Sequence, residues 1–281
     1  MPYLAVMQGR LVPPEGGHFQ SFPRERWQDE FGLAAEAGLN GIEWIFDVYG
    51  EGANPLACDE GIAEMRALSE KTGIVVRSLC ADYFIDRPFL RATQSEREKL
   101  IQKMEWLLAR CRIGGISRVV IPFVDRSRIE NEDDKIQVLS ILRTLLRTAE
   151  TNRVELHLET SLAPQPFAAL LGQCPHPLLR ANYDSGNSSS LGYVVSEEFG
   201  AYGHRIGSVH IKDRRRGGGT VPVGTGDADL PAVFRGLAAL AYRGDYVLQV
   251  ARSEPNRELS WIAQNRAWVG NQIEGSAGAR Q

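Results

Sequence analysis

The chain repeats one pattern: an amphipathic helix, a break that usually contains glycine, and then a short hydrophobic run rich in β-forming residues. The breaks in EAGLNGIEW, EKTGIVVRS, RIGGISRVV and YRGDYVLQV each place glycine where the end of a helix needs a positive φ. Helices and strands that alternate in this way indicate a parallel sheet. The predicted strands are Tyr3–Gln8, Gly41–Ile45, Ile74–Leu79, Arg118–Phe123, Val154–Glu159, Leu179–Asp184, Ile206–Ile211 and Tyr246–Val250.

Eight such units in 281 residues match the number and size expected of a closed (β/α)8 barrel. An open doubly wound sheet usually has fewer strands and a glycine-rich phosphate fingerprint after its first strand, which QGRLVPPEGG lacks. We therefore predict an α/β fold, a single (β/α)8 TIM barrel that forms one catalytic domain over residues 1–274. The remaining segment 275–281, GSAGARQ, is small and polar and is predicted to be a disordered tail.

Charge and cysteine content narrow the classes of partner. The net charge of −3 provides no positive field to attract nucleic acid or an anionic membrane surface. The four cysteines are spread singly, which disfavours a zinc ribbon, a redox dithiol or a secreted disulfide framework. The N-terminal segment MPYLAVMQGR is too short in apolar residues for a signal peptide. We expect a cytoplasmic protein that acts on a small polar molecule.

Four predicted strands in the second half of the chain end in a side chain that can bind a metal. These side chains are Glu159, Asp184, His210 and Gln249. A barrel gathers the C-terminal ends of its strands on one face, where enzymes of this architecture hold their active sites. Strand alternation points further polar side chains into the barrel, namely Gln8, Glu43, Glu155, His157, Asn182 and Lys212. Burying so many polar groups costs several kcal/mol unless they are paired or bound to a cation, so we predict one divalent metal ion.

The segments HLET, NYDSGN, VHIKD and GDYVLQ resemble the xylose-isomerase-like family of sugar and sugar-phosphate isomerases and epimerases. The resemblance spans roughly residues 3–265 and implies one divalent metal ion held by Glu, Asp, His and Glu at the ends of strands five to eight. Glu159, Asp184, His210 and Gln249 stand at these positions. The resemblance also implies a sugar or sugar phosphate as the small-molecule substrate. Relatives are often dimers or tetramers, so a homo-oligomer is a further expectation.

Gln249 departs from the family pattern. In the family's epimerases one glutamate removes a proton from the sugar carbon and the other returns one from the opposite face. A carboxamide has no proton-transfer chemistry near neutral pH and lowers the ligand charge from −3 to −2. We therefore predict one base, Glu159, which moves a proton between adjacent carbons through an enediolate in an aldose–ketose isomerisation. Ketose 3-epimerisation stays open if Asp213, Glu43 or His157 supplies a second base.

The remaining predictions concern the metal and the substrate. A mixed set of carboxylate, imidazole and amide ligands favours manganese, with magnesium, cobalt or zinc as alternatives. Lys212 and Asp213, which follow His210, complete the predicted catalytic set with Glu159. The run IKDRRRGGGTVPVGTGD combines arginines with glycines where barrels often bind phosphate, which makes a phosphorylated sugar plausible. The predicted substrate-binding residues are Gln8, Arg10, Glu43, His157, Arg214 and Arg252.

Two other functions fit parts of the sequence. Apurinic-site endonucleases share the superfamily resemblance, but they need extra histidines and a basic groove. Five histidines and a net charge of −3 disfavour that reading. A barrel that has lost turnover and only binds a sugar is the other alternative, and the glutamine at position 249 suggests it.

Overall fold

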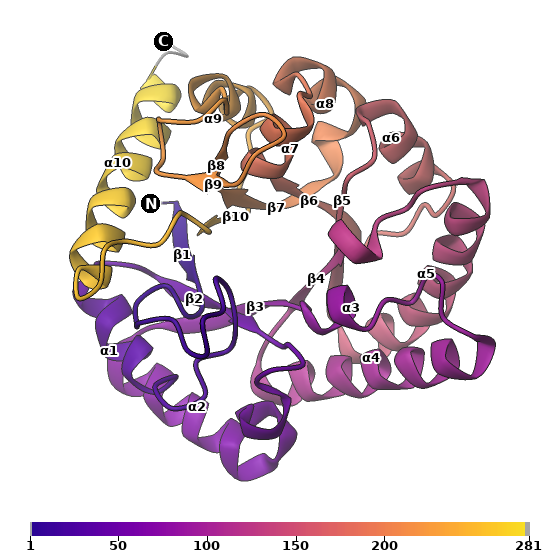
Figure 1. Ribbon diagram of the computed structural model, residues 1–281, viewed down its shortest axis with the longest axis horizontal. Coiled ribbons are helices and arrows are strands. Elements are labelled where there is room, and N and C mark those ends of the chain that lie inside the picture. The colour runs from indigo at the N-terminus through magenta and orange to yellow at the C-terminus, as the bar shows by residue number, and fades with distance from the viewer. Residues whose placement is uncertain (1, 279–281) are drawn as a thin grey trace.

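The computed structural model describes residues 2–278, in which parallel strands close into a central barrel with helices around it (Figure 1). In order around the ring, the strands are β1 (Tyr3–Met7), β10 (Asp245–Leu248), β7 (Ile206–Ile211), β6 (Leu179–Asp184), β5 (Glu155–Thr160), β4 (Arg118–Phe123), β3 (Val75–Cys80) and β2 (Gly41–Ile45). The ladders between neighbouring strands are parallel. The predicted barrel is confirmed, and the predicted strand ends differ from these by at most two residues.

Helices connect the strands on the outside of the barrel (Figure 1). They are α1 (Asp29–Glu36), α2 (Asp59–Thr72), α3 (Tyr83–Asp86), α4 (Gln94–Gly114), α5 (Glu132–Asn152), α6 (Pro164–Gly172), α7 (Ser185–Leu191), α8 (Val195–Tyr202), α9 (Leu230–Ala239) and α10 (Glu258–Gly278), with 3-10 turns η1 (Glu51–Ala53), η2 (Pro55–Ala57), η3 (Asp125–Ser127) and η4 (Gly203–Arg205). Within the described chain, none of these helices combines the length and apolar composition that a membrane crossing requires.

The C-terminal segment differs from the prediction. Helix α10 continues to Gly278, so residues 275–278 of the predicted disordered tail are helical. Residues 279–281, the rest of that tail, lie outside the described residues.

Strand alternation divides the barrel into an apolar outside and a polar inside. On β5, Leu156 and Leu158 are fully buried in the hydrophobic core, and the same core contains Leu142 and Leu145 from α5. Each leucine that is fully buried in this way contributes roughly 1.5–3 kcal/mol to stability. The alternate residues of β5 are polar and face the barrel interior, so one strand both anchors a helix and presents site residues.

Three of the four glycines that were predicted to end a helix have the expected positive φ. Gly38, Gly73 and Gly115 follow α1, α2 and α4 with φ values of 74°, 75° and 80°. Before β10 the positive φ of 51° belongs to Ala241 instead. Gly244 is needed for space, because a Cβ there would lie 2.5 Å from the carbonyl oxygen of Gly207.

Candidate active site

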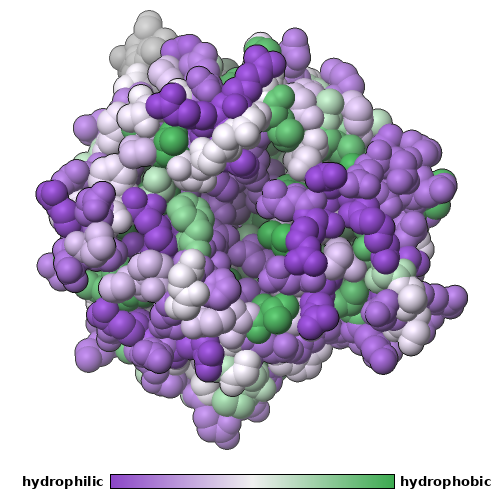
Figure 2. All heavy atoms as spheres, in the orientation of Figure 1, coloured by the Kyte–Doolittle hydropathy of each residue, from purple (hydrophilic) through white to green (hydrophobic). Residues whose placement is uncertain are grey.

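A cavity of about 650 Å³ opens at the C-terminal end of the barrel strands. Figure 2 shows this face, with a hollow near its centre where hydrophilic side chains prevail. The antiparallel hairpin of β8 (Asp213–Arg214) and β9 (Thr220–Val221) follows β7 beside it. Glu159, Asn187, Lys212, Arg214 and Gln249 contribute to the cavity wall, so the strand ends that carried the metal prediction meet at one opening.

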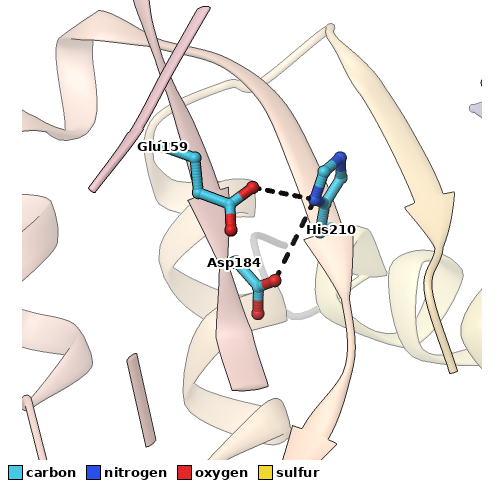
Figure 3. Close-up of side chains that lie close together, drawn as sticks. All are labelled: Glu159, Asp184 and His210. Atoms are coloured by element: carbon cyan, nitrogen blue, oxygen red, sulfur yellow. Dashed lines mark ion pairs between the residues drawn. The ribbon is translucent and has the colours of Figure 1, made fainter. Parts of the chain in front are cut away.

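Three of the four predicted metal ligands lie together (Figure 3), and one of them, Glu159, lines this cavity. Glu159, Asp184 and His210 each offer one ligand atom, and these atoms lie within 4.8 Å of one another. The distance from His210 Nδ1 is 3.3 Å to Glu159 Oε2 and 4.0 Å to Asp184 Oδ2. The three residues come from the neighbouring strands β5, β6 and β7, and Asp184 is the register partner of His210. Parallel pairing therefore brings Asp184 beside His210, and the inward direction of Glu159 brings its carboxylate to the same histidine.

Asp184 is oriented by the helix that follows it. It is the N-cap of α7, and its Oδ1 accepts hydrogen bonds from the backbone N–H groups of Gly186 at 2.8 Å and Asn187 at 2.7 Å. This leaves Oδ2 directed toward His210 and Lys212. The sequence NYDSGN therefore encodes a helix start that also fixes the free oxygen of the carboxylate.

Two asparagines hold the carboxylate of Glu159. Asn182 Nδ2 donates to Oε2 at 3.0 Å, and Asn187 Nδ2 donates to Oε1 at 2.6 Å. Arg214 in turn donates to Asn187 Oδ1 at 2.8 Å, which fixes the orientation of that amide. Glu159 is only 6% exposed but lines the cavity, so it is both held in place and open to a bound molecule.

His210 is fully buried and is oriented by Glu43. The distance from His210 Nε2 to Glu43 Oε1 is 2.6 Å, which leaves Nδ1 facing Glu159 and Asp184. Burial lowers the pKa of His210, but the carboxylates of Glu43 and Glu159 outweigh it and raise this pKa well above its ordinary value. A carboxylate behind a histidine is the usual partner of a metal ligand, because it fixes the tautomer.

Lys212 connects Gln249 to the ligand cluster. Its Nζ donates to Asp184 Oδ2 at 3.3 Å and to Gln249 Oε1 at 3.2 Å. Within residues 2–278, Glu43 Oε2 has no hydrogen-bond partner. The cluster thus combines several carboxylates with an imidazole nitrogen and an amide oxygen, all of which can bind a metal. A single lysine lies among them to balance the negative charge. A divalent cation fits this donor set and its surplus of negative charge.

Two of the predicted substrate-binding residues lie deeper in the barrel than the cavity. His157 is fully buried between Ser208 Oγ at 2.7 Å and Glu155 Oε2 at 2.8 Å. Gln8 is also fully buried, and its Oε1 accepts a hydrogen bond from the backbone N–H of Ile45 at 2.9 Å. Both side chains are therefore hydrogen-bonded inside the barrel, and neither of them lines the cavity.

Arg10 and Arg252 hold loops together. Arg10 donates to the carbonyl oxygens of Val250 at 3.0 Å and Phe19 at 3.1 Å, and burial lowers its pKa to about 9. Arg252 donates to the carbonyl oxygens of Phe19 at 2.7 Å and Gly9 at 2.8 Å. Both guanidinium groups therefore link the end of β10 to the segment between β1 and α1, whereas a substrate-binding role was predicted for them.

Asp213 is also a loop-holding residue. It is fully buried, and its carboxylate accepts backbone N–H groups of Gly224 at 2.8 Å, Gly226 at 2.9 Å and Ala228 at 3.1 Å. These three bonds hold the carboxylate against the segment between β9 and α9. Of the predicted residues after His210, Lys212 and Arg214 reach the cavity and Asp213 does not.

The opposite wall contains residues that the sequence patterns did not single out. Asp82 lies two residues beyond β3, and Gln20 lies between β1 and α1. Gln20 Nε2 donates to Asp82 Oδ2 at 2.7 Å, and Gln249 Nε2 donates to Gln20 Oε1 at 3.0 Å. Gln20 lies too far beyond β1 for strand alternation to place it. Asp82 has the same alternation as Cys80, which also lines the cavity, but it lies three residues beyond the predicted strand end at Leu79.

The family assignment agrees with this geometry. The model of the xylose isomerase-like TIM barrel family matches residues 31–271. The chain belongs to this family. A Haemophilus influenzae relative of this xylose isomerase-like barrel, named "Putative L-ribulose-5-phosphate 3-epimerase SgbU", is 23% identical over 268 residues, which cover 88% of this chain and 92% of that protein.

Two solved structures illustrate the shared fold. The structure of an L-ribulose 3-epimerase has a TM-score of 0.79 at 16% identity and covers 100% of this chain and 97% of its own. A xylose isomerase-like TIM barrel protein from Mycobacterium smegmatis, solved in complex with magnesium, has a TM-score of 0.71 at 18% identity and covers 98% of each chain. At these identities the likeness establishes the fold alone.

Proposed function

We propose that this xylose isomerase-like barrel is a divalent-metal-dependent enzyme that isomerises or epimerises a ketose or a ketose phosphate. The observation that carries the proposal is the cluster of Glu159, Asp184 and His210 beside a polar cavity. The family and the names of the relatives, which include an L-ribulose 3-epimerase, support a sugar as the substrate.

The proposed metal ligands are Glu159, Asp184 and His210, with the amide oxygen of Gln249 as the fourth. When bound, the ion would polarise the sugar carbonyl and stabilise negative charge on its oxygen. Oxygen and nitrogen donors suit manganese, which we favour, and they also suit magnesium, cobalt or zinc. The magnesium complex of the relative from Mycobacterium smegmatis supports a divalent metal in this barrel type.

Glu159 is the proposed base. Asn182 and Asn187 hold its two oxygens at the edge of the cavity, so its position relative to a bound sugar is fixed. The carboxylate takes the proton from the carbon next to the carbonyl. Lys212 and Arg214, which line the same cavity, neutralise the oxygen that gains charge and bind hydroxyl or phosphate groups.

The number of bases decides between the two reaction types. A single base returns the proton to the adjacent carbon and interconverts an aldose and a ketose. Epimerisation requires a second group on the other face of the carbon. Asp213, Glu43 and His157 are engaged in buried contacts and do not line the cavity. Epimerisation at carbon 3 is nevertheless the second candidate, because two of the similar proteins are named 3-epimerases.

Proton exchange tests the proposal. We expect the manganese-loaded protein to incorporate deuterium from D2O into L-ribulose 5-phosphate or L-ribulose next to the carbonyl, as followed by NMR. EDTA should stop the exchange, and added manganese should restore it. Tight binding of either sugar without exchange would instead favour a sugar-binding barrel. Faster reaction of the phosphorylated sugar would support a phosphate contact through Arg214.

A further inference from the structure

We propose that Asp82 is the second proton-transfer group and acts on the face of the sugar carbon opposite Glu159, so that the reaction is epimerisation at carbon 3. This inference rests on the proposed function and names the group that replaces the lost glutamate at position 249.

A chain of hydrogen bonds connects that lost position to Asp82. Gln249 occupies the end of the eighth barrel strand, where the resemblance places the second glutamate. Its Nε2 donates to Gln20 Oε1 at 3.0 Å, and Gln20 Nε2 donates to Asp82 Oδ2 at 2.7 Å. All three side chains line the cavity that Glu159 also lines. A carboxylate therefore stands two hydrogen bonds away from the amide that cannot transfer a proton.

The strand order separates this chain of hydrogen bonds from Glu159 around the ring of strands. Strand β1 is four strands from β5 in either direction around the closed barrel, so the two lie on opposite sides. Gln20 belongs to the segment that follows β1, and Asp82 and Gln249 follow β3 and β10 on either side of it. Asp82 follows β3, two strands from β5, and Gln249 follows β10, three strands from β5, so a sugar in the cavity would lie between Glu159 and these two side chains.

Other carboxylates of the cavity wall are less suited to proton transfer. Both oxygens of Asp47 accept backbone N–H groups, from Phe22 at 2.8 Å and from Gly50. Asp86 and Asp125 are exposed at the rim. Asp82 is partly buried, and its hydrogen-bond partners are side chains, which can rearrange when a sugar binds.

The surroundings of Asp82 raise the pKa of its carboxyl group, which favours a role in proton transfer. Burial raises its pKa to about 6, with smaller contributions from the charges of Glu159 and Asp47. Hydrogen bonds from Gln20 and from the Cys80 thiol, at 3.1 Å, oppose this rise. An acid or base with a pKa near the working pH can exist in both forms during turnover.

The Glu159 carboxylate takes the proton from carbon 3, the C–H bond breaks, and its electron pair moves toward the neighbouring carbonyl oxygen to form an enediolate. The carboxylic acid of Asp82 then gives its proton to carbon 3 from the opposite face, and the electron pair returns to form the new C–H bond. The product is the 3-epimer. Glu159 is left protonated and Asp82 ionised, and exchange of protons with water restores both.

The variant Asp82→Asn separates this role from that of Glu159. With L-ribulose 5-phosphate or L-ribulose and manganese in D2O, we expect epimer formation to fall by about 100-fold or more. Deuterium incorporation at carbon 3 with retained configuration should continue within about threefold of wild type, because Glu159 still removes and returns the proton on its own face. Equal epimer formation by wild type and Asp82→Asn would overturn the proposal.

Two further variants exclude a merely structural effect. Asp86→Asn removes the same charge from the rim of the same cavity and should leave both rates unchanged. Asp82→Glu restores a carboxylic acid and should recover part of the epimerisation. If Asp82 only positioned Gln20, exchange and epimerisation would fall together, which would overturn the proposal. An aldose product without a 3-epimer from wild type would also overturn it, whereas a wild type that neither exchanges nor converts either sugar would contradict the proposed function itself.

Discussion

At the N-terminal end of the barrel a buried carboxylate is paired with two arginines, whereas at the C-terminal end several buried carboxylates share one lysine. Asp245, at the start of β10, forms ion pairs with Arg77 of β3 and Arg118 of β4. The guanidinium of Arg77 also lies over the ring of Tyr3, 3.3 Å from its centroid. These contacts close the N-terminal end with charges that satisfy one another.

The C-terminal end has the opposite balance. Glu43, Glu159 and Asp184 surround His210, and Lys212 is the nearby cation that contacts Asp184. A buried negative charge without a full set of partners is costly, so it is retained where a ligand supplies the missing charge. Buried charge in this barrel therefore stabilises the fold at one end and prepares a cation site at the other.

The largest expected effect is on turnover, at the C-terminal end. Glu159→Gln removes the proposed base and one metal ligand, and we expect the rate of ketose conversion to fall by about 10³- to 10⁴-fold. The free energy of unfolding should change by less than about 1 kcal/mol, because the amide keeps the shape of the side chain. Rate assays and urea denaturation measure the two quantities. Unchanged rates would remove Glu159 from the mechanism.

At the N-terminal end we expect the reverse. Asp245→Asn leaves Arg77 and Arg118 without their charged partner, so the free energy of unfolding should fall by about 4 kcal/mol. The rate per folded molecule should stay within about threefold of wild type, since the change lies at the far end of the barrel from the cavity. Urea denaturation and rate assays on the soluble fraction check both statements. A loss of rate without a loss of stability would break the distinction between the two ends.

We expect the stability to depend on pH through Glu30, a buried carboxylate that is held by backbone N–H groups. It accepts the N–H groups of Gly9 and Leu11, and burial raises its pKa from 4.5 to about 7. The folded state therefore binds this proton more tightly than the unfolded state. Relative to Glu30→Gln, the stability of wild type should be highest below pH 4.5 and should fall by about 3 kcal/mol as the pH rises through 7. A difference that stays constant from pH 4 to pH 8 would contradict this pKa.

The smallest expected effect concerns the ligand charge at the metal site. Gln249→Glu restores a third anionic ligand beside Asp184, so the affinity for manganese should rise by about tenfold. Isothermal titration calorimetry measures this affinity, and Gln249→Ala, which removes the amide oxygen, serves as the control that should weaken binding. Equal affinities for all three proteins would show that position 249 does not contact the ion.

Much of the fold and part of the site could be predicted from periodicity. Within a strand, side chains alternate between the two faces, and neighbouring parallel strands bring their ends to one edge. This was sufficient to place Glu159, Asp184 and His210 together, and alternation still held one residue beyond the strands for Lys212 and Gln249. The catalytic role predicted for Asp213 did not rest on alternation, which points this side chain away from the barrel interior, and the chain turns there into the β8–β9 hairpin.

The loops account for the remaining differences. Arg10 and Arg252 were expected at the substrate, but their guanidinium groups donate to backbone carbonyl oxygens of the segment before α1. Asp82 and Gln20 were not expected there, although both line the cavity. Hydrogen bonds between segments far apart in the chain decide the directions of Arg10, Arg252 and Gln20, and no local pattern predicts them.

The order of strands and helices, the closed barrel and the strand ends that carry the ligand cluster follow from the sequence alone, because hydrophobic periodicity is a local property of the chain. The folded chain settles which polar side chains face the cavity and which are hydrogen-bonded within loops. A buried polar group needs a hydrogen-bond partner, and that partner can lie far away in the sequence: Gln20, one partner of Gln249, is 229 residues away along the chain.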